Sequence, residues 1–280
     1  MGKRLLQLFP QPGGEVEVEG LYLSHRVHEI GAPGHPFVYG NFVASLDGRI
    51  ALQDDDGQSH VPKALTTAED WSLFRELHAQ ADCYITHGGY LRALAAGRLD
   101  DILQVGVRTD DTHLLEWRKN NGLTKQPGIV AASASLDFPL PPSIIEHDQK
   151  LIIATGEQAD RDRIKAWRAR GCEILLAGKG RLVEAAPLVQ ALAKRGFRCI
   201  YLLAGPQMLE SMLMDAQLVR MYLTLNHRLL GGDAFHTLLA GRKLGDAGLL
   251  TLRSLYYAPP SDANTGQFFA RFDPPNSNIF

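Results

Sequence analysis

The sequence is poor in the features that would assign a chain to a protein class at once. Its 280 residues include only three cysteines, Cys83, Cys172 and Cys199, each isolated among apolar residues. Buried free thiols are typical of a reducing compartment, so we expect a cytoplasmic protein without a disulfide framework. The formal net charge is −2. Because nucleic-acid binding proteins carry a basic excess, we expect no nucleic-acid partner.

Long apolar runs are also missing. No stretch of about 18 uncharged apolar residues occurs, so we expect no membrane span. The N-terminal residues MGKRLLQLFPQPGG contain too short an apolar run for a secretory signal.

Metal and nucleotide signatures are absent as well. The ten histidines are scattered without HxxxH spacing, and no zinc-deaminase pattern occurs, so we expect no metal site. Gly178, Lys179 and Gly180 lack the third glycine of a dinucleotide fingerprint and the Ser or Thr of a P-loop. The missing G-x-S-x-G motif argues against an α/β-hydrolase.

The residues that are present indicate a globular chain of one large domain or two small ones. Hydrophobic residues make up 45% and charged residues 21%, which is enough apolar content for a substantial core. We divide the chain into an N-terminal extension or edge hairpin over residues 1–35, a main domain over 36–258 and a C-terminal tail over 259–280.

Strand and helix patterns alternate along the main domain, which favours an α/β fold with a mostly parallel sheet covered by helices. Thr66 and Thr67 have capping spacing to Glu69 and Asp70 and predict a helix start. Further helices are predicted over 158–170, 182–195 and 207–215, and strands over 83–86, 129–132, 151–154, 172–176, 199–203 and 220–225. Residues 97–126 show little period.

The stretch Pro36–Ile50, PFVYGNFVASLDGRI, predicts a buried strand that ends in a polar turn. Asp47 follows the strand directly, and ligands bind beyond strand ends in α/β sheets. A carboxylate there can orient or protonate a substrate. Asp and Gly are also standard turn residues, so a purely structural turn stays an alternative.

A second strand end resembles an anion-binding turn. His87, Gly88 and Gly89 join a strand to a helical stretch, and backbone NH groups at a helix start can face a phosphate. Gly205 and Pro206 precede another helix, and Pro206 suits its first turn, where the missing NH costs nothing. Glycine pairs are common in loops, so a structural reading of the first turn is equally open.

Three segments taken together, PFVYGNFVASLDGRI, LTTAEDWSLFRELHAQADCYITHGG and KRGFRCIYLLAGPQMLESMLMDAQLVRMYLTLNHRLLGG, resemble one family. It is the reductase domain of bacterial riboflavin-biosynthesis deaminase-reductases. The resemblance covers roughly Pro36 to Gly232, and NFVASLDG is its most specific piece. It implies a three-layer α/β/α dihydrofolate-reductase-like fold with a mixed, mostly parallel sheet, and usually a homodimer.

The resemblance also implies an activity and its residues. The family uses NADPH to reduce a small heterocycle, as in 5-amino-6-(5-phosphoribosylamino)uracil reductase. Asp47 would be the catalytic carboxylate against substrate, with Asn41 and Ser45 binding substrate. Cofactor contacts would come from residues at several strand ends: Ala44, His87, Gly88, Gly89, Ser133, Thr155, Gly205 and Pro206.

Two turns differ from the family pattern. The first usually reads Gly-x-Gly-Thr, and this chain has His87, Gly88, Gly89 and Tyr90. The second usually reads Glu-Gly-Gly, and this chain has Ala-Gly-Pro ending at Pro206. These differences leave a second hypothesis open, a catalytically silent relative that binds a nucleotide or other small ligand, or acts as an interaction subunit.

Overall fold

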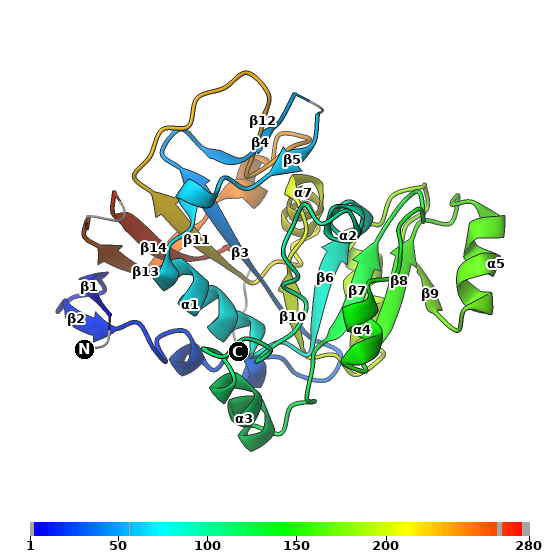
Figure 1. The fold of residues 1–280 in the computed structure, drawn as a ribbon, viewed down its shortest axis with the longest axis horizontal. Coiled ribbons are helices and arrows are strands. Elements are labelled where there is room, and N and C mark those ends of the chain that lie inside the picture. Colours follow the sequence, from blue (N-terminus) through cyan, green and yellow to red (C-terminus); the bar gives the residue numbers. More distant parts are fainter. Residues whose placement is uncertain (1–2, 56, 262–264, 276–280) are drawn as a thin grey trace. The chain divides into compact units, whose positions relative to one another are not determined.

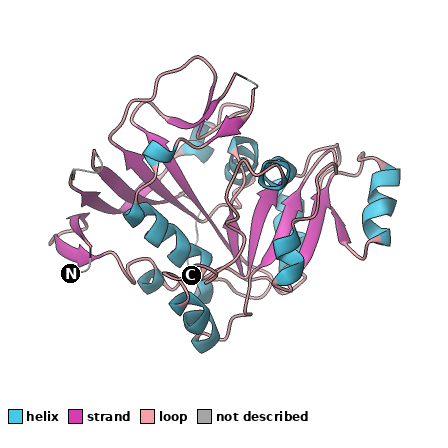
Figure 2. Cartoon of the chain, in the orientation of Figure 1, coloured by secondary structure: helices cyan, strands magenta, loops and turns pink. Residues whose placement is uncertain are grey.

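A computed structural model describes residues 3–55, 57–261 and 265–275 of the chain (Figure 1). The chain divides into two compact units, which are described separately. The first comprises residues 1–26, 39–77 and 205–280, and the second comprises residues 27–38 and 78–204. Both units combine strands with helices (Figure 2).

The first unit is built on a sheet with the strand order β2-β1-β13-β14-β11-β3. Only β11 and β3 pair in parallel, and the other neighbours are antiparallel. A small second sheet has the order β12-β4-β5. The strands of this unit are β1 (Arg4–Phe9), β2 (Gly14–Glu17), β3 (Phe37–Ser45), β4 (Arg49–Gln53), β5 (Ser59–His60), β11 (Arg220–Asn226), β12 (Phe235–Thr237), β13 (Thr251–Ala258) and β14 (Gln267–Asp273); its helices are α1 (Ala68–His78) and α7 (Pro206–Met214).

The second unit contains five parallel strands in the order β10-β6-β7-β8-β9. Most of their residues are buried, as expected for strands covered on both faces. The strands are β6 (Cys83–His87), β7 (Gly128–Ala132), β8 (Leu151–Thr155), β9 (Glu173–Leu176) and β10 (Cys199–Leu202); the helices are α2 (Gly88–Ala95), α3 (His113–Asn120), α4 (Pro142–Glu146), α5 (Arg161–Ala169) and α6 (Ala185–Ala193). Short 3-10 turns lie in both units: Leu23–His25, Lys63–Leu65 and Gly245–Gly248 in the first, and Val27–Glu29 in the second.

The predicted alternation of strands and helices is confirmed. Helices α5 and α6 and strands β9 and β10 lie within the predicted ranges. Helix α7 and strands β6, β7, β8 and β11 each extend one residue beyond the predicted range. The N-terminal hairpin forms from β1 and β2, with β2 at the sheet edge. Antiparallel pairing in the first unit is more extensive than the sequence predicts, because β1, β13 and β14 all join its sheet.

Strand β14 lies within residues 259–280, the segment that the sequence analysis assigns to a C-terminal tail. It lies between β13 and β11, and hydrogen-bonded pairing joins it to both strands. Phe269 is 1% exposed there, so the strand contributes to the core. Residues 262–264 and 276–280 lie outside the described residues.

The uninterpreted segment 97–126 contains helix α3. Its Arg118 is fully buried and donates to the carbonyl oxygens of Ala79 and Ala81 at 2.9 and 2.8 Å. The sequence did not predict this helix, because one of its buried positions is an arginine and not an apolar residue. Within the part of the chain that the structure describes, no helix has the length and apolar character needed to cross a membrane.

Helix α1 packs on one face of the first unit's sheet, in front of β3 and β11 in Figure 1. Thr67 caps the helix, because its hydroxyl accepts from the Asp70 NH at 3.2 Å. The Thr224 hydroxyl on β11 donates to Asp70 at 2.6 Å, and Gln267 on β14 donates to Thr67 at 2.5 Å. This contact between helix and sheet is therefore polar as well as apolar.

Glu76 at the other end of α1 fastens the N-terminal segment to the helix. Its carboxylate accepts from the backbone NH groups of Gly20, Tyr22 and Leu23 at 2.5, 2.7 and 3.2 Å. The residue is 2% exposed, and burial raises its pKa from 4.5 to about 7 although the three NH groups oppose that shift.

Replacing Glu76 with Gln is expected to change how stability depends on pH. Because the folded state holds the Glu76 proton to higher pH than the unfolded chain, the stabilisation is complete below pH 4.5 and is lost as the pH rises through about 7. The change in the free energy of unfolding is on the order of 3 kcal/mol. Urea unfolding of wild type and Glu76→Gln across this range measures it.

The exposed Glu157 provides the control for this experiment. The Glu157→Gln variant should follow the wild-type pH dependence. If the free energy of unfolding depended on pH in the same way for wild type and Glu76→Gln, the raised pKa of Glu76 would be contradicted.

Candidate active site

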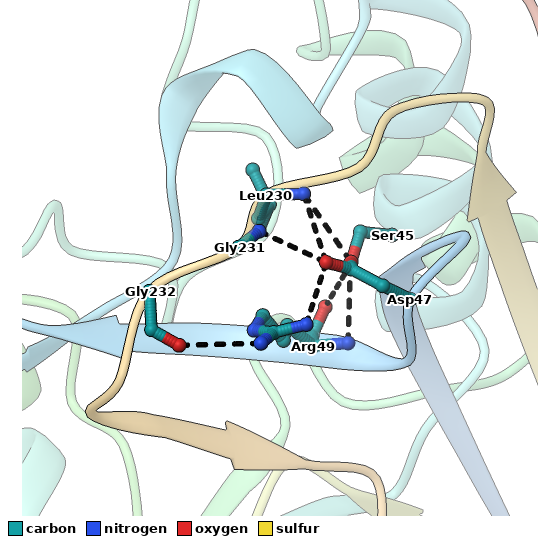
Figure 3. A network of polar contacts seen from close by, with 6 residues as sticks. All are labelled: Ser45, Asp47, Arg49, Leu230, Gly231 and Gly232. Atoms are coloured by element: carbon teal, nitrogen blue, oxygen red, sulfur yellow. Dashed lines mark hydrogen bonds and ion pairs between the residues drawn. The ribbon is translucent and has the colours of Figure 1, made fainter.

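The Asp47 carboxylate joins three backbone segments of the first unit (Figure 3). Arg49 donates to it at 2.6 Å from the start of β4. The backbone NH groups of Leu230 and Gly231, which follow β11, donate at 3.1 and 2.9 Å. The Ser45 hydroxyl donates to its other oxygen. Hydrogen bonds therefore hold the turn that the sequence predicts after β3 to the start of β4 and to the segment after β11.

This environment holds Asp47 in its ionised form. The hydrogen bond from Ser45 is the largest cause and the NH of Gly231 the second, and together with Leu230 and Arg49 they hold the pKa well below its usual range. The carboxylate is consequently a fixed negative charge at neutral pH. An ionised carboxylate is unsuited to donate a proton. Of the two roles that the sequence allows for Asp47, orienting a substrate is therefore favoured over protonating it.

Arg49 is the principal partner that sequence reasoning missed. Its guanidinium also donates to the carbonyl oxygen of Gly232 at 3.2 Å and lies 4.1 Å from the centre of the Phe235 ring. It thereby ties β4 to the start of β12. The sequence signal was its position two residues after Asp47, but its contacts depend on a segment about 180 residues further along.

The three other predicted residues of β3 divide between the two faces of the strand. Asn41 and Ser45 project to one face, because side chains alternate along a strand, and Ala44 projects to the other. Ser45 is fully buried and also accepts from the Arg49 NH at 3.1 Å. Ala44 is 4% exposed. The structure therefore brings Ser45 into the Asp47 network.

In the second unit, the carboxyl ends of β6, β7 and β8 meet at one edge of the parallel sheet. His87 pairs with Ala132, and Ala132 with Ala154, across the three strands. Because α2 begins at Gly88, the first two predicted residues of the phosphate turn lie at the junction of β6 and α2. Parallel strand ends of this kind are usual sites for ligands.

His87 caps helix α2. Its Nδ1 accepts from the backbone NH of Tyr90 at 3.3 Å, so the ring occupies a donor that a phosphate could otherwise use. Desolvation, and second the nearby Arg92, lower the pKa of His87 below 6.5. The lowered pKa disfavours the charged ring, so His87 is poorly suited to supply a positive charge for an anion.

Close approach at this edge explains why Gly88 is a glycine. A Cβ on Gly88 would lie 2.9 Å from the Ser133 Oγ. Ser133 is buried, and its Oγ accepts from the Leu136 NH at 3.0 Å. Gly88 and Ser133 are thus neighbours, as the predicted shared ligand requires.

Thr155 at the end of β8 has a different character. The residue is fully buried, and its hydroxyl has no hydrogen-bond partner among the described residues. Buried polar groups without partners are uncommon and point to a strained or functional position. Thr155 thereby remains a candidate ligand contact.

Tyr90 lies where the family pattern has threonine, and its side chain is used within the second unit. The hydroxyl donates to the carbonyl oxygen of Asp100 at 3.0 Å and accepts from the Ile102 NH at 3.1 Å. Tyr90 as a whole is 9% exposed. Tyr90 therefore organises the loop after α2.

Gly205 and Pro206 begin helix α7 in the first unit, as predicted. Gly205 is the N-cap residue and Pro206 the first helical residue. A Cβ on Gly205 would meet nothing within 4 Å. Pro206 has no NH, so the first turn offers one donor fewer to an anion. Across the described ranges, no three His, Cys, Asp or Glu side chains are grouped to hold a metal ion.

Changing Asp47 to Asn is expected to loosen the segment that follows β11. An amide NH2 in place of one carboxylate oxygen would face the donors Leu230, Gly231 and Arg49, and charge-assisted hydrogen bonds would be lost. Hydrogen exchange at the Leu230 and Gly231 amides should accelerate about tenfold or more.

A matched variant is Asp54→Asn, in a turn where Asp54 accepts from the Gln58 NH at 2.7 Å. It should leave exchange at Leu230 and Gly231 unchanged. Equal exchange rates in wild type and Asp47→Asn would show that the carboxylate does not hold this segment.

Comparisons with known proteins agree on one family. Residues 36–255 match the RibD C-terminal domain. A reductase from Archaeoglobus fulgidus, 2,5-diamino-6-ribosylamino-4(3H)-pyrimidinone 5′-phosphate reductase, is 23% identical over 178 residues, 64% of this chain and 74% of that protein.

Two solved structures share the fold. A pyrimidine reductase-like protein from Corynebacterium diphtheriae has a TM-score of 0.62 at 18% identity, over 85% of this chain and 91% of that one. Acinetobacter baumannii RibD has a TM-score of 0.59 at 17% identity, over 86% of this chain and 58% of that one. The predicted α/β class with a mixed sheet is thereby confirmed, and the chain belongs to the RibD C-terminal domain family.

Proposed function

We propose that this chain is an NADPH-dependent reductase of a small heterocyclic substrate, in the manner of the pyrimidinone 5′-phosphate reductase that it resembles. The observation that carries the proposal is the family match over residues 36–255, which includes the intact Ser45–Asp47 strand end. Binding positions the reactants, and the residues around them exclude water.

The residues present fit a dinucleotide at the strand ends of the second unit. Gly88 and Ser133 are close neighbours, and the Thr155 hydroxyl makes no hydrogen bond within the described part of the chain. His87, Gly88 and Gly89 would accompany the phosphates, with Ser133 and Thr155 toward the adenosine. NADPH, when bound, supplies the hydride.

Residues of the first unit complete the proposal. Ala44, Gly205 and Pro206 stay proposed cofactor contacts, and Asn41 and Ser45 stay proposed substrate contacts. We expect Asp47, whose charge the Arg49 guanidinium balances in part at 2.6 Å, to orient a hydrogen-bond donor of the substrate. Because Ser45, Arg49 and two backbone NH groups already donate to the carboxylate, we expect the proton that accompanies hydride transfer to come from another group.

A second function has an observation in its favour. His87 occupies the Tyr90 NH, and Pro206 lacks an NH, so two family turns offer fewer donors for phosphate. A relative that binds a nucleotide or other small ligand without turnover would tolerate both changes.

The compartment and assembly follow from the same proposal. Cys83 and Cys199 are buried, Cys172 is half-buried, and all three are free thiols, which suits a reducing cytoplasm. We expect a homodimer, as the family resemblance implies.

Thermal unfolding with saturating NADPH, beside NADH, tests the cofactor proposal. A ligand at about one hundred times its Kd adds roughly 2.7 kcal/mol, which raises the midpoint by several degrees. We expect a larger shift with NADPH than with NADH.

Thr155→Val is the matched variant, because it removes the hydroxyl and nearly keeps the side-chain shape. Its unliganded midpoint should equal the wild-type midpoint or exceed it, since the lost hydroxyl has no partner among the described residues. The NADPH shift should be smaller. No shift of the wild type with either cofactor would overturn the proposal.

A further inference from the structure

A row of polar side chains crosses the first unit's sheet near the start of β11. Strand register pairs Tyr222 with Arg271 and Arg271 with Ser254, and register partners project to the same side of a sheet. Tyr222 lies two residues before Thr224, which donates to Asp70 of α1. Because side chains alternate along a strand, the row lies on the face that α1 covers.

Two more arginines lie beside this row and share one carboxylate. The Nε atoms of Arg220 and Arg253 lie 3.1 and 3.2 Å from the two carboxylate oxygens of Asp273. Asp273 is 2% exposed, so this pairing is largely shielded from water. We call Arg220, Arg253, Arg271 and Asp273 the arginine cluster. Three guanidinium groups and one carboxylate give it a formal charge of +2.

Arg271 has no carboxylate of its own. It forms no ion pair with any residue that the structure describes, and its Nε is buried without a hydrogen-bond partner there. The residue is half-buried. Taking a charged group out of water costs free energy unless an opposite charge compensates for it. The guanidinium of Arg271 therefore favours an anion beside it.

Ser254, the next residue of the row, has a second donor without a partner. The residue is 4% exposed, and its hydroxyl makes no hydrogen bond within the described part of the chain. Buried hydroxyl groups are normally hydrogen-bonded, so this one needs an explanation. An oxyanion accepts from a guanidinium and a hydroxyl together, and it would satisfy both neighbours.

Aromatic rings border the arginine cluster. The Tyr222 ring lies 4.7 Å from the Tyr22 ring and 5.7 Å from the His25 ring, measured between centroids. The Tyr222 hydroxyl lies 2.9 Å from the Nδ1 of His25. Burial, and after it the charges of Arg271 and Arg220, lower the pKa of His25 to about 3. The charge that acts on this ring is therefore positive, in agreement with the excess of arginine over aspartate.

We propose that the arginine cluster and Ser254 bind a small oxyanion with the size and charge of a phosphate group. Guanidinium groups bind phosphate oxygens through parallel N–H donors, and Arg271 has such donors to offer. Register partners on adjacent strands lie about 5 Å apart, so one phosphate can accept from Arg271 and Ser254 together. Asp273 is already paired with two arginines, and the cluster keeps a net positive charge for the ligand.

This site is separate from the candidate active site. In the parallel pairing of β11 with β3, Arg220 lies opposite Tyr39, and Asn226 lies opposite Ser45. Ser45 donates to Asp47, so the Asp47 network lies at the far end of the same strands. Strand residues spaced about 3.3 Å apart put about 20 Å between the two ends. The inference therefore does not depend on the reductase proposal.

Nitrogen-15 NMR of the arginine Nε–H groups tests the site at Arg271 itself, with its signal assigned through bonds to the backbone. Inorganic phosphate and glycerol 3-phosphate, a small phosphate monoester, are titrated separately into the wild-type protein at constant ionic strength. We expect a saturable shift of the Arg271 signal, because a bound oxyanion accepts from this group. Saturation by either ligand supports the proposal, and the tighter one distinguishes free phosphate from a monoester as the natural ligand.

Ser254→Ala removes the unpartnered hydroxyl with little change of shape. The dissociation constant for phosphate, read from the Arg271 signal, should rise about tenfold, since a hydrogen bond to a charged ligand is lost. The melting midpoint without ligand should equal the wild-type value or exceed it, because the hydroxyl has no partner within the described residues. Ser135→Ala is the control, because Ser135 is exposed and belongs to the second unit, and it should leave the dissociation constant unchanged.

Three results would overturn the inference. The first is an Arg271 signal that neither phosphate compound moves. The second is an Arg271 signal that sodium chloride moves as far as phosphate does at the same ionic strength, since that would show charge screening alone. The third is an equal affinity for phosphate in wild type and Ser254→Ala. The first two need only the wild-type protein, so the test stands even if the variant unfolds.

Discussion

The carboxylate of Asp47 is the interaction on which the candidate site depends. It gathers a hydroxyl, a guanidinium and two backbone NH groups from the end of β3, the start of β4 and the segment after β11. Without that charge, several donors would face one another at a strand end. Because so many donors stabilise the ionised form, the pKa stays low and the group provides a permanent field rather than an exchangeable proton.

The sheet of the first unit makes both polar and apolar contacts on the face that α1 covers. Thr224 donates to Asp70 there, and Phe269, its register partner on β14, is 1% exposed. Strand β11 runs from this contact to the segment that fastens Asp47, so the packing of the sheet and the geometry of the site share one element.

Local patterns predict a large part of this structure. The apolar stretch before Asp47 predicts β3, and glycine stops with helical periodicity predict α5 and α6. The sequence could not identify Leu230 and Gly231 as partners of Asp47. They lie 183 and 184 residues away along the chain and come near only through the parallel pairing of β3 with β11. Strand β14 was missed for the same reason, since its pairing partners β11 and β13 decide its place.

Transfer of deuterium from NADPH labelled at the nicotinamide C4 tests the reductase account most directly. The substrate would be the pyrimidinone 5′-phosphate named for the Archaeoglobus fulgidus relative, and the product would be analysed by mass spectrometry. The account predicts a reduced product that carries one deuterium from the labelled face and none when unlabelled NADPH is used. A chain that binds NADPH and the pyrimidinone yet returns both unchanged would contradict it and favour a ligand-binding relative without turnover.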